Sequence, residues 1–191
     1  MASSFLDLTV GELLNEVASE RRSPGGGPVL ALTLAMAAGV VAMAARASAG
    51  DWAVETAARA DDFRSQAAAL ADRDAEAFEH ALEVLDAREA IEPDRRDREI
   101  GDAVAGAAAP LIEIGELALD VARLAAEAAA QSDERLRPDA VAAAALAAAV
   151  ATGAAELVAI NLTATKTDDR VARARELAED ADRAARFAAF N

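Results

Sequence analysis

The stretch Ser23-Pro24-Gly25-Gly26-Gly27-Pro28 and the 17 uncharged residues that follow it, 29–45, decide the fold. Three consecutive glycines cost more backbone entropy on folding than an ordinary loop requires, so they indicate a close approach of bare backbone to a helix or a ligand. Pro28 suits the first residue of a helix, because its missing N–H would have no partner there in any case. The stretch therefore predicts either a helix N-terminus with free amides, suited to an anionic group, or a tight turn between two helices.

Composition places the chain in the all-α class. Of its 191 residues, 57 are alanine and only 3% are aromatic. Alanine is the strongest helix former and is disfavoured in strands, and the sequence has no run of alternating Val, Ile, Thr and aromatic residues. The length suffices for one sizeable core and no linker is evident, so we expect a single domain over residues 1–191.

Charge and cysteine content argue against several classes of function. The net charge of −15 disfavours nucleic acids and anionic membrane surfaces, both of which bind clustered Lys and Arg. The chain has no cysteine and its start lacks the basic segment of a signal peptide, so we expect a cytoplasmic protein. The uncharged run 29–45 is just shorter than a membrane span, and we expect a buried helix there and no membrane partner.

Hydrophobic periodicity, helix breakers and capping residues predict six helices. The helices are expected at about 9–20, 28–48, 51–90, 93–131, 139–164 and 169–190. Their expected N-terminal caps include Thr9, Asp51 and either Thr167 or Asp168. The first helix opens with a capping box that ends in Glu12, and its apolar face carries Leu13, Leu14 and Val17.

Two of these helices, at 28–48 and 139–164, are apolar nearly all round, so every side of them has to be covered. A chain of 191 residues can bury one such helix centrally, but burying two is harder. We therefore expect a homodimer, most simply a two-fold dimer, in which these helices form the interface.

Polar residues that interrupt apolar faces are the candidates for chemistry. Asp74 lies on the apolar face of the third helix, where desolvation would raise its pKa and suit a general acid/base; the alternative is an ion pair with an arginine. Asp139 opens the fifth helix, where it is either a second catalytic group or an N-terminal cap. Asn161 lies in an apolar setting where an amide needs partners or a ligand, and Glu156 nearby suits a ligand contact or an interface ion pair.

Two further residues have weaker signals. Trp52 could stack against a planar ligand, although an anchor in the core or an interface explains it as well. His80, the only histidine, lies among charged residues and is typical of a solvated face. We expect no metal site, because the chain lacks cysteine ligands and a Glu-x-x-His pair.

The order of these motifs resembles the cyclodeaminase/methenyltetrahydrofolate cyclohydrolase family over nearly the whole chain. That family typically carries a Thr-Pro-Gly-Gly-Gly element, an Asp-Ala-x-Ala-Phe motif, a Pro-Leu pair, a Ser-Asp-Ala element and an Ile-Asn-Leu motif. The matching segments here are 23–27, 74–78, 110–111, 138–140 and 160–162. Each match is short, but their collinear order is specific.

The resemblance implies an all-α dimer that binds a tetrahydrofolate derivative as substrate in a groove between helices. Such enzymes close 5-formiminotetrahydrofolate to 5,10-methenyltetrahydrofolate with loss of ammonia, or add water to the methenyl bridge. The resemblance implies Asp74 and Asp139 as the proton-transferring carboxyl groups, without a metal or a tightly bound cofactor. The resemblance implies that the backbone of Gly25, Gly26 and Gly27 approaches the ligand and that Asn161 bonds one of its polar edges. Pro24, Trp52 and Glu156, taken from their own settings in the sequence, complete the expected substrate-binding residues.

Departures from the family pattern keep two other functions open. The segment Gly50-Asp51-Trp52-Ala53 has an acid and an aromatic residue where the family has cations, and Thr163 stands where it has Lys. The alternatives are a divergent enzyme on the same scaffold that acts on a non-folate small molecule, and a non-catalytic dimeric helical protein. Likeness of fold alone does not choose among the three.

Overall fold

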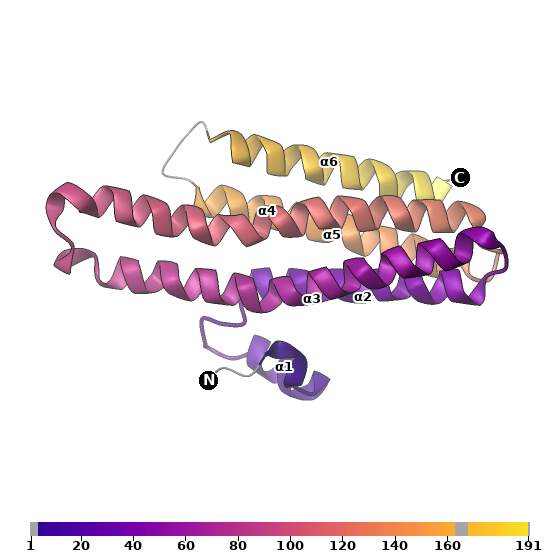
Figure 1. Cartoon of the computed structure of the whole chain (residues 1–191), viewed down its shortest axis with the longest axis horizontal. Coiled ribbons are helices and arrows are strands. Elements are labelled where there is room, and N and C mark those ends of the chain that lie inside the picture. The colour runs from indigo at the N-terminus through magenta and orange to yellow at the C-terminus, as the bar shows by residue number, and fades with distance from the viewer. Residues whose placement is uncertain (1–3, 163–167, 191) are drawn as a thin grey trace.

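The computed structural model describes residues 4–162 and 168–190, in which the chain forms six α-helices and no strand (Figure 1). The helices are α1 (Val10–Val17), α2 (Gly26–Ala47), α3 (Asp51–Asp86), α4 (Pro93–Gln131), α5 (Arg137–Asn161) and α6 (Asp169–Phe190). Single 3-10 turns, η1 (Phe5–Asp7) and η2 (Arg88–Ala90), precede α1 and follow α3. The predicted all-α bundle of six helices is confirmed. Thr163 and Thr167 lie outside the described residues.

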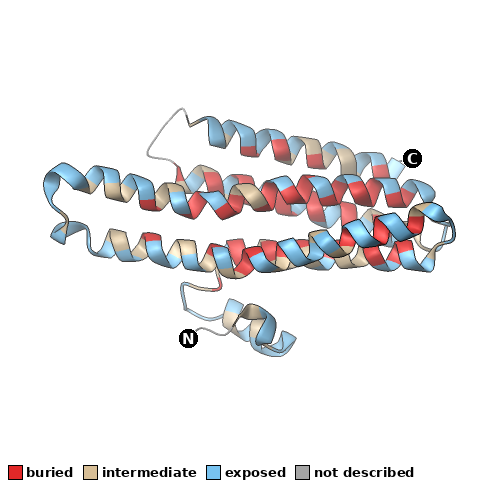
Figure 2. Ribbon diagram, viewed as in Figure 1, coloured by how far each residue is buried: buried red, intermediate tan, exposed pale blue. Residues whose placement is uncertain are grey.

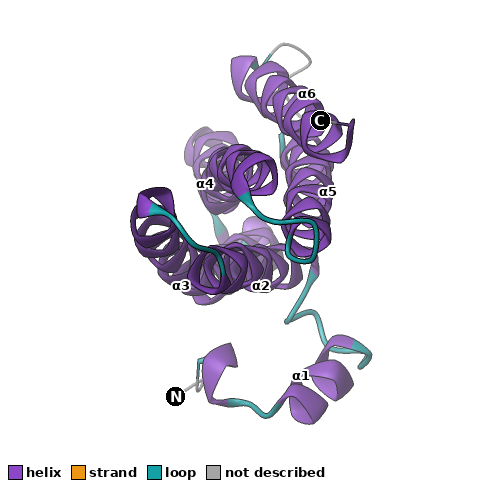
Figure 3. Cartoon of the chain, turned by 90° about the vertical axis from the view of Figure 1, so that its right-hand side faces the viewer, coloured by secondary structure: helices purple, strands orange, loops and turns teal. Residues whose placement is uncertain are grey.

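The five long helices, α2 to α6, form the bundle, and α1 lies beside it (Figure 3). Helix α4 packs against α2, α3, α5 and α6, while α2 also packs against α3 and α5. Small residues let these helices approach closely: a Cβ atom on Gly153 of α5 would lie 2.9 Å from a methyl carbon of Leu30 on α2. In this alanine-rich sequence the helices therefore pack so closely that a side chain of one helix contacts the backbone of the next.

Among the described helices α4 contributes the most buried residues to the core (Figure 2), and Ile114 and Leu124 are the largest fully buried side chains on it. The two most apolar helices, α2 and α5, each keep one face exposed. Their large exposed side chains are Met36 and Met43 on α2 and Leu146 and Ile160 on α5. By length and composition alone both helices could cross a membrane, but half of each apolar window is buried inside the bundle. Within the single chain neither helix is covered on every side, because the other helices pack against only part of each.

The helix starts follow local chemistry, with two corrections. Gly25 is the N-cap of α2, so the helix begins two residues before Pro28, the expected first residue. Pro28 still falls in the first turn, where backbone amides have no acceptor four residues back, and its missing N–H costs nothing. Gly50 rather than Asp51 is the N-cap of α3, and its φ of 121° favours glycine.

Two other caps and one helix end complete the comparison with the expected boundaries. Thr9 forms the expected capping box: its hydroxyl accepts from the amide of Glu12 and the Glu12 carboxylate accepts from the amide of Thr9. The Asp168 carboxylate accepts from the amide of Arg170 at 2.9 Å and so caps α6. Helix α3 ends at Asp86, four residues earlier than expected, and a 3-10 turn follows it.

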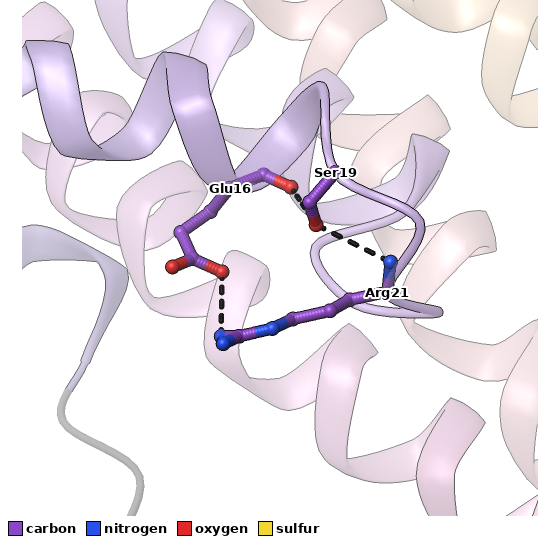
Figure 4. Close-up of polar contacts among 3 residues, drawn as sticks. All are labelled: Glu16, Ser19 and Arg21. Carbon is purple, nitrogen blue, oxygen red and sulfur yellow. Dashed lines mark hydrogen bonds and ion pairs between the residues drawn. The ribbon is translucent and has the colours of Figure 1, made fainter.

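Polar contacts among Glu16, Ser19 and Arg21 hold the turn between α1 and the glycine-rich segment (Figure 4). The hydroxyl of Ser19 donates to the carbonyl of Glu16 at 2.7 Å and accepts from the amide of Arg21 at 3.2 Å, while the Arg21 guanidinium donates to the Glu16 carboxylate at 2.8 Å. On the apolar face of α1, Leu14 and Val17 are exposed, and α1 has no buried residue. This helix is held beside the bundle by its connecting segments.

The end of α3 and the start of α4 extend past the other helices as a two-helix arm (Figure 1). A small apolar cluster of Ala81, Ala103 and Ala107, with Val84 packed against it, holds the two helices of the arm together. The arm leaves the bundle where α2 begins and α5 ends. Four helices therefore surround one space at this end of the molecule.

Candidate functional site

A cavity of about 140 Å³ that opens to solvent lies where these four helices meet. Its wall combines the start of α2, the end of α5 and the facing sides of α3 and α4. The lining residues are Arg22, Ser23, Gly25, Gly26, Gly27, Pro28, Asp74, Ala75, Phe78, Ala107, Leu111, Leu157 and Asn161. These residues come from segments far apart in the sequence, and they combine an apolar wall with a few polar groups, as small-molecule sites do.

Asp74 is the buried ionisable group of this cavity, with 6% of its surface exposed. Burial raises the pKa of its carboxyl from 3.8 to about 6 by disfavouring the charged form. Among the described residues no arginine or lysine forms an ion pair with Asp74, so the structure gives no support to the alternative of a buried Asp–Arg pair. The nearby Arg73 turns away and pairs with Glu113 on α4 at 2.7 Å.

The glycine-rich segment lies directly against this carboxyl. A Cβ atom on Gly27 would lie 2.0 Å from Oδ2 of Asp74, far closer than any real contact, whereas one on Gly26 would meet only the flexible side chain of Leu157 at 3.2 Å. Gly25 caps α2 without a side chain, so the first amides of the helix have no side-chain acceptor from the cap. Backbone amides at a helix start carry partial positive charge and suit a negative or electron-rich group. Pro24 is buried next to these glycines and lines a neighbouring cavity.

Asn161, the last residue of α5, closes the cavity from the opposite side. Its amide nitrogen donates to the carbonyl oxygen of Ala107 on α4 at 3.5 Å, which is the long limit of a hydrogen bond. Pro110 lies one turn further along α4 and is buried within the helix. A half-buried amide with one long hydrogen bond has donor and acceptor capacity left for a ligand.

The apolar wall was not singled out as binding residues by sequence reasoning. Phe78 faces the cavity from α3, Leu111 from α4 and Leu157 from α5. Phe78 and Leu111 belong to the motifs at 74–78 and 110–111, so their closeness in sequence to Asp74 and Pro110 could have identified them as binding residues. Arg22 gave no signal at all, because it precedes the glycines in a segment without periodicity; its side chain is mostly exposed and lies 3.6 Å from Asp86.

Three expected site residues lie away from this cavity. Trp52 stands at the start of α3 and packs against the apolar cluster that contains Val41 and Leu124, which fits an anchor rather than a stacking platform. Asp139 is exposed in the first turn of α5, roughly 33 Å along the helix from Asn161 at 1.5 Å per residue. Its carboxyl does not cap the helix either, since the N-cap is Leu136. Glu156 is exposed on the outer face of α5.

A second cavity of about 450 Å³, largely open to solvent, adjoins the first along Ser23 and Ala75. Its lining is rich in carboxylates, which are Glu16, Asp72, Glu76 and Glu79. One of these, Asp72, accepts a hydrogen bond from the amide of Phe5 at 3.0 Å and so holds the N-terminal segment against α3. Among the described residues no group of three or more His, Asp or Glu side chains is placed to hold a metal ion.

Comparisons with known proteins agree with this architecture. A model of the formiminotransferase-cyclodeaminase family matches residues 9–180. Among solved structures, a formiminotetrahydrofolate cyclodeaminase from Thermotoga maritima superposes with a TM-score of 0.83 at 23% sequence identity, covering 95% of this chain and 93% of that chain. No curated protein matches the chain. At 23% identity the structural likeness shows a shared fold, whereas the family match spans nearly the whole sequence.

Proposed function

Because this chain belongs to the formiminotransferase-cyclodeaminase family, we propose that its cavity binds a tetrahydrofolate carrying a one-carbon group and that Asp74 transfers protons at that group. The observation that carries the proposal is a buried carboxyl without an ion-pair partner among the described residues, set in the wall of a largely apolar cavity. A pKa of about 6 lets such a group hold and release a proton near neutral pH. The matching Thermotoga protein is a formiminotetrahydrofolate cyclodeaminase, which supports the same substrate class.

The proposed reaction is ring closure of 5-formiminotetrahydrofolate. N10 of the substrate attacks the carbon of the N5-formiminium group, which gives a tetrahedral centre bonded to N5, N10 and an amino group. The Asp74 carboxylate accepts the proton from N10 and then donates it to the amino group. The carbon–nitrogen bond to that amino group breaks, ammonia leaves, and the methenyl bridge between N5 and N10 remains. Since one proton moves from N10 to the leaving group, a single carboxyl suffices for both transfers.

The environment of Asp74 suits a group that works in both directions. With a pKa of about 6, the carboxyl is mainly ionised at pH 7, and roughly a tenth of the molecules carry the proton. A well-placed general acid/base of this kind contributes on the order of 10²- to 10⁴-fold in rate. In this proposal Asp139 has no part, because the structure places it at the far end of α5.

The other cavity residues have binding roles in the proposal. The planar pterin ring packs against the apolar wall of Phe78, Leu111 and Leu157, and the amide of Asn161 bonds a polar ring edge. The backbone amides of Gly25 and Gly26 face the electron-rich side of the ligand. Methenyltetrahydrofolate hydrolysis would use the same carboxyl to activate water, so cyclohydrolase activity is the second reaction to measure.

One observation favours a different substrate as the second candidate. Arg22 is the only cation lining the cavity among the described residues, and the adjoining cavity is acidic. A glutamate tail binds best through cations, so a divergent enzyme would take a small molecule without an anionic tail. In that case Asp74 keeps its role in proton transfer and the identity of the ligand changes.

We further propose that the protein is a homodimer. Helices α2 and α5 pack against each other, and each keeps large apolar side chains exposed, Met36 and Met43 on α2 and Leu146 and Ile160 on α5. If these side chains packed against a second copy, each Å² of apolar surface removed from water would stabilise the dimer by about 25 cal/mol. A cytoplasmic location fits a folate enzyme and remains our proposal.

The test of function is an absorbance assay for 5,10-methenyltetrahydrofolate formed from 5-formiminotetrahydrofolate, with purified wild type, Asp74→Asn and the control Asp62→Asn. Asp62 is an exposed carboxylate on the same helix. We expect enzyme-dependent product with wild type and Asp62→Asn, and a loss of at least about 100-fold with Asp74→Asn. Absence of cyclisation and of methenyl hydrolysis in the wild type would reject the folate proposal, and equal activity in all three proteins would reject the role of Asp74.

A further inference from the structure

The space that a side chain at position 27 would need is already filled. An ideal Cβ atom on Gly27 would lie 2.0 Å from Oδ2, 2.3 Å from Cγ and 2.6 Å from Oδ1 of Asp74. All three distances are below any real contact of a Cβ atom. The carboxyl group of Asp74 therefore occupies the Cβ site of Gly27.

No other described glycine has this relationship to a charged group. At Gly39, on the same helix, an added Cβ would make an ordinary contact of 3.6 Å with the side chain of Arg64. At Gly50 and Gly153 the close neighbours are the side chains of Trp52 and Leu30, each at 2.9 Å. Gly27 is thus the position where a missing side chain makes room for the buried acid.

We propose that Gly27 is a positioning residue, whose bare backbone forms the seat that fixes the Asp74 carboxyl at the start of α2. The catalytic consequence rests on the proposed function, but the seat itself does not. Asp74 is buried, and among the described residues no ion pair holds its carboxyl in place. Its orientation therefore comes from the surfaces that it touches, and one of these is the backbone of Gly27.

The seat limits what Asp74 can do when it is disturbed. Its side chain has only two rotatable bonds, so a methyl group at position 27 forces the carboxyl into another rotamer. The open direction leads into the cavity, which is solvent-accessible and is where the ligand binds. A displaced carboxyl would be better hydrated, which lowers its pKa, and it would obstruct the ligand.

A double-mutant cycle tests the seat without any substrate. The proteins are wild type, Gly27→Ala, Asp74→Ala and the double variant, with Gly39→Ala as the matched control on α2. We expect Gly27→Ala to lower Tm by roughly 5 °C in the presence of Asp74 and to cost little once Asp74→Ala has vacated the space. Gly39→Ala should leave Tm unchanged or raise it, as alanine does in helices. An equal loss of Tm from Gly27→Ala in both backgrounds would overturn the proposal; if Gly27→Ala alone fails to fold, a folded double variant supports it.

The position of the carboxyl is read by ¹³C NMR of carboxyl-labelled aspartate in the apo protein, with Asp74→Asn to assign the resonance. We expect the Asp74 titration midpoint to fall by about 1 pH unit in Gly27→Ala and to stay in place in Gly39→Ala. In the folate assay, Gly27→Ala should lower kcat by about 100-fold or more, which a purely structural role would not do in folded enzyme. An unchanged midpoint together with unchanged kcat would overturn the proposal. Because the NMR and Tm experiments use no folate, failure of the folate proposal leaves this one testable.

Discussion

The two ends of the bundle present carboxylates in opposite ways. At the end where α2 begins, Asp74 is buried against Gly27 with no ion-pair partner among the described residues. At the other end, Asp61 forms an ion pair with Arg46, and Asp139 is exposed at the start of α5. Burial without a counter-charge raises the pKa of a carboxyl, whereas solvent leaves the acid ionised at neutral pH. The acid proposed to transfer protons therefore differs from the other two in its environment, since all three lie on helices of the same bundle.

The largest difference between the two ends should appear in the pH dependence of activity. Since burial raises the pKa of Asp74 to about 6, its carboxylate form is lost as the pH falls below that value. We expect kcat/KM for cyclisation to fall about 100-fold from pH 7 to pH 4, with a slope of one on a logarithmic plot. Initial rates corrected for the spontaneous reaction measure this. A flat profile, or a limb with the midpoint of an exposed carboxylate, would erase the distinction between the two ends.

Stability should depend on Asp74 in the opposite sense from an ion-paired acid. The pKa of its carboxyl is 3.8 when exposed and about 6 in the folded protein, so the folded state binds more protons between these values. Stability is then lost as the pH rises through this window, and the full cost is present above pH 6. We expect Asp74→Asn to stabilise the protein by about 2 kcal/mol at pH 8 and hardly at all at pH 3.5.

Urea unfolding of wild type and Asp74→Asn at both pH values gives these free energies. Asp62→Asn is the control, because it removes one negative charge from an exposed position on the same helix, and its effect on stability should show no such pH dependence. A stabilisation that is equal at pH 3.5 and pH 8 would mean that the carboxyl is not the cause. Loss of activity together with a gain of stability is the signature of a functional acid kept at a cost.

Trp52 tests the other end of the bundle. Its half-buried side chain packs against the apolar cluster that contains Val41 and Leu124, far along α3 from Asp74. We expect Trp52→Ala to lower the free energy of unfolding by about 1–2 kcal/mol through lost apolar contact, with less than a twofold change in kcat/KM. A tenfold loss of kcat/KM in a protein of normal stability would instead indicate that Trp52 contacts the ligand and that the site extends to this end of the bundle.

Sequence reasoning found the parts of the site that have a local signal. Asp74 stands out because it interrupts an apolar face, and the glycines stand out because three in a row serve no ordinary loop. The start and end of α4, at Pro93 and Gln131, were also predictable, since proline and the end of the apolar pattern mark them. The exposure of α1 was not predictable, because periodicity identifies an apolar face but not what covers it.

The arrangement in space has no local signal either. Asp74, Leu111 and Leu157 line one cavity because they lie at the same height along three neighbouring helices. That height depends on the axial position of each helix relative to the others, which no local sequence pattern specifies. Asp139 shows the same limit from the other side. Its motif and its place at a helix start suggested a partner for Asp74, yet the length of α5 separates it from the cavity by roughly 33 Å.

The smallest expected effect is that of Asp139→Asn, and it completes the comparison. The Asp139 carboxylate is exposed in the first turn of α5, where a negative charge interacts favourably with the free amides. Its replacement should cost about 0.5 kcal/mol of stability, less in high salt, and change kcat/KM by less than twofold. Within one chain Asp139 cannot reach Asp74, so a second subunit is the only route by which it could join the site. A tenfold loss of activity at unchanged stability would therefore show that the site is completed across a dimer interface, and a concentration-dependent activity should then accompany it.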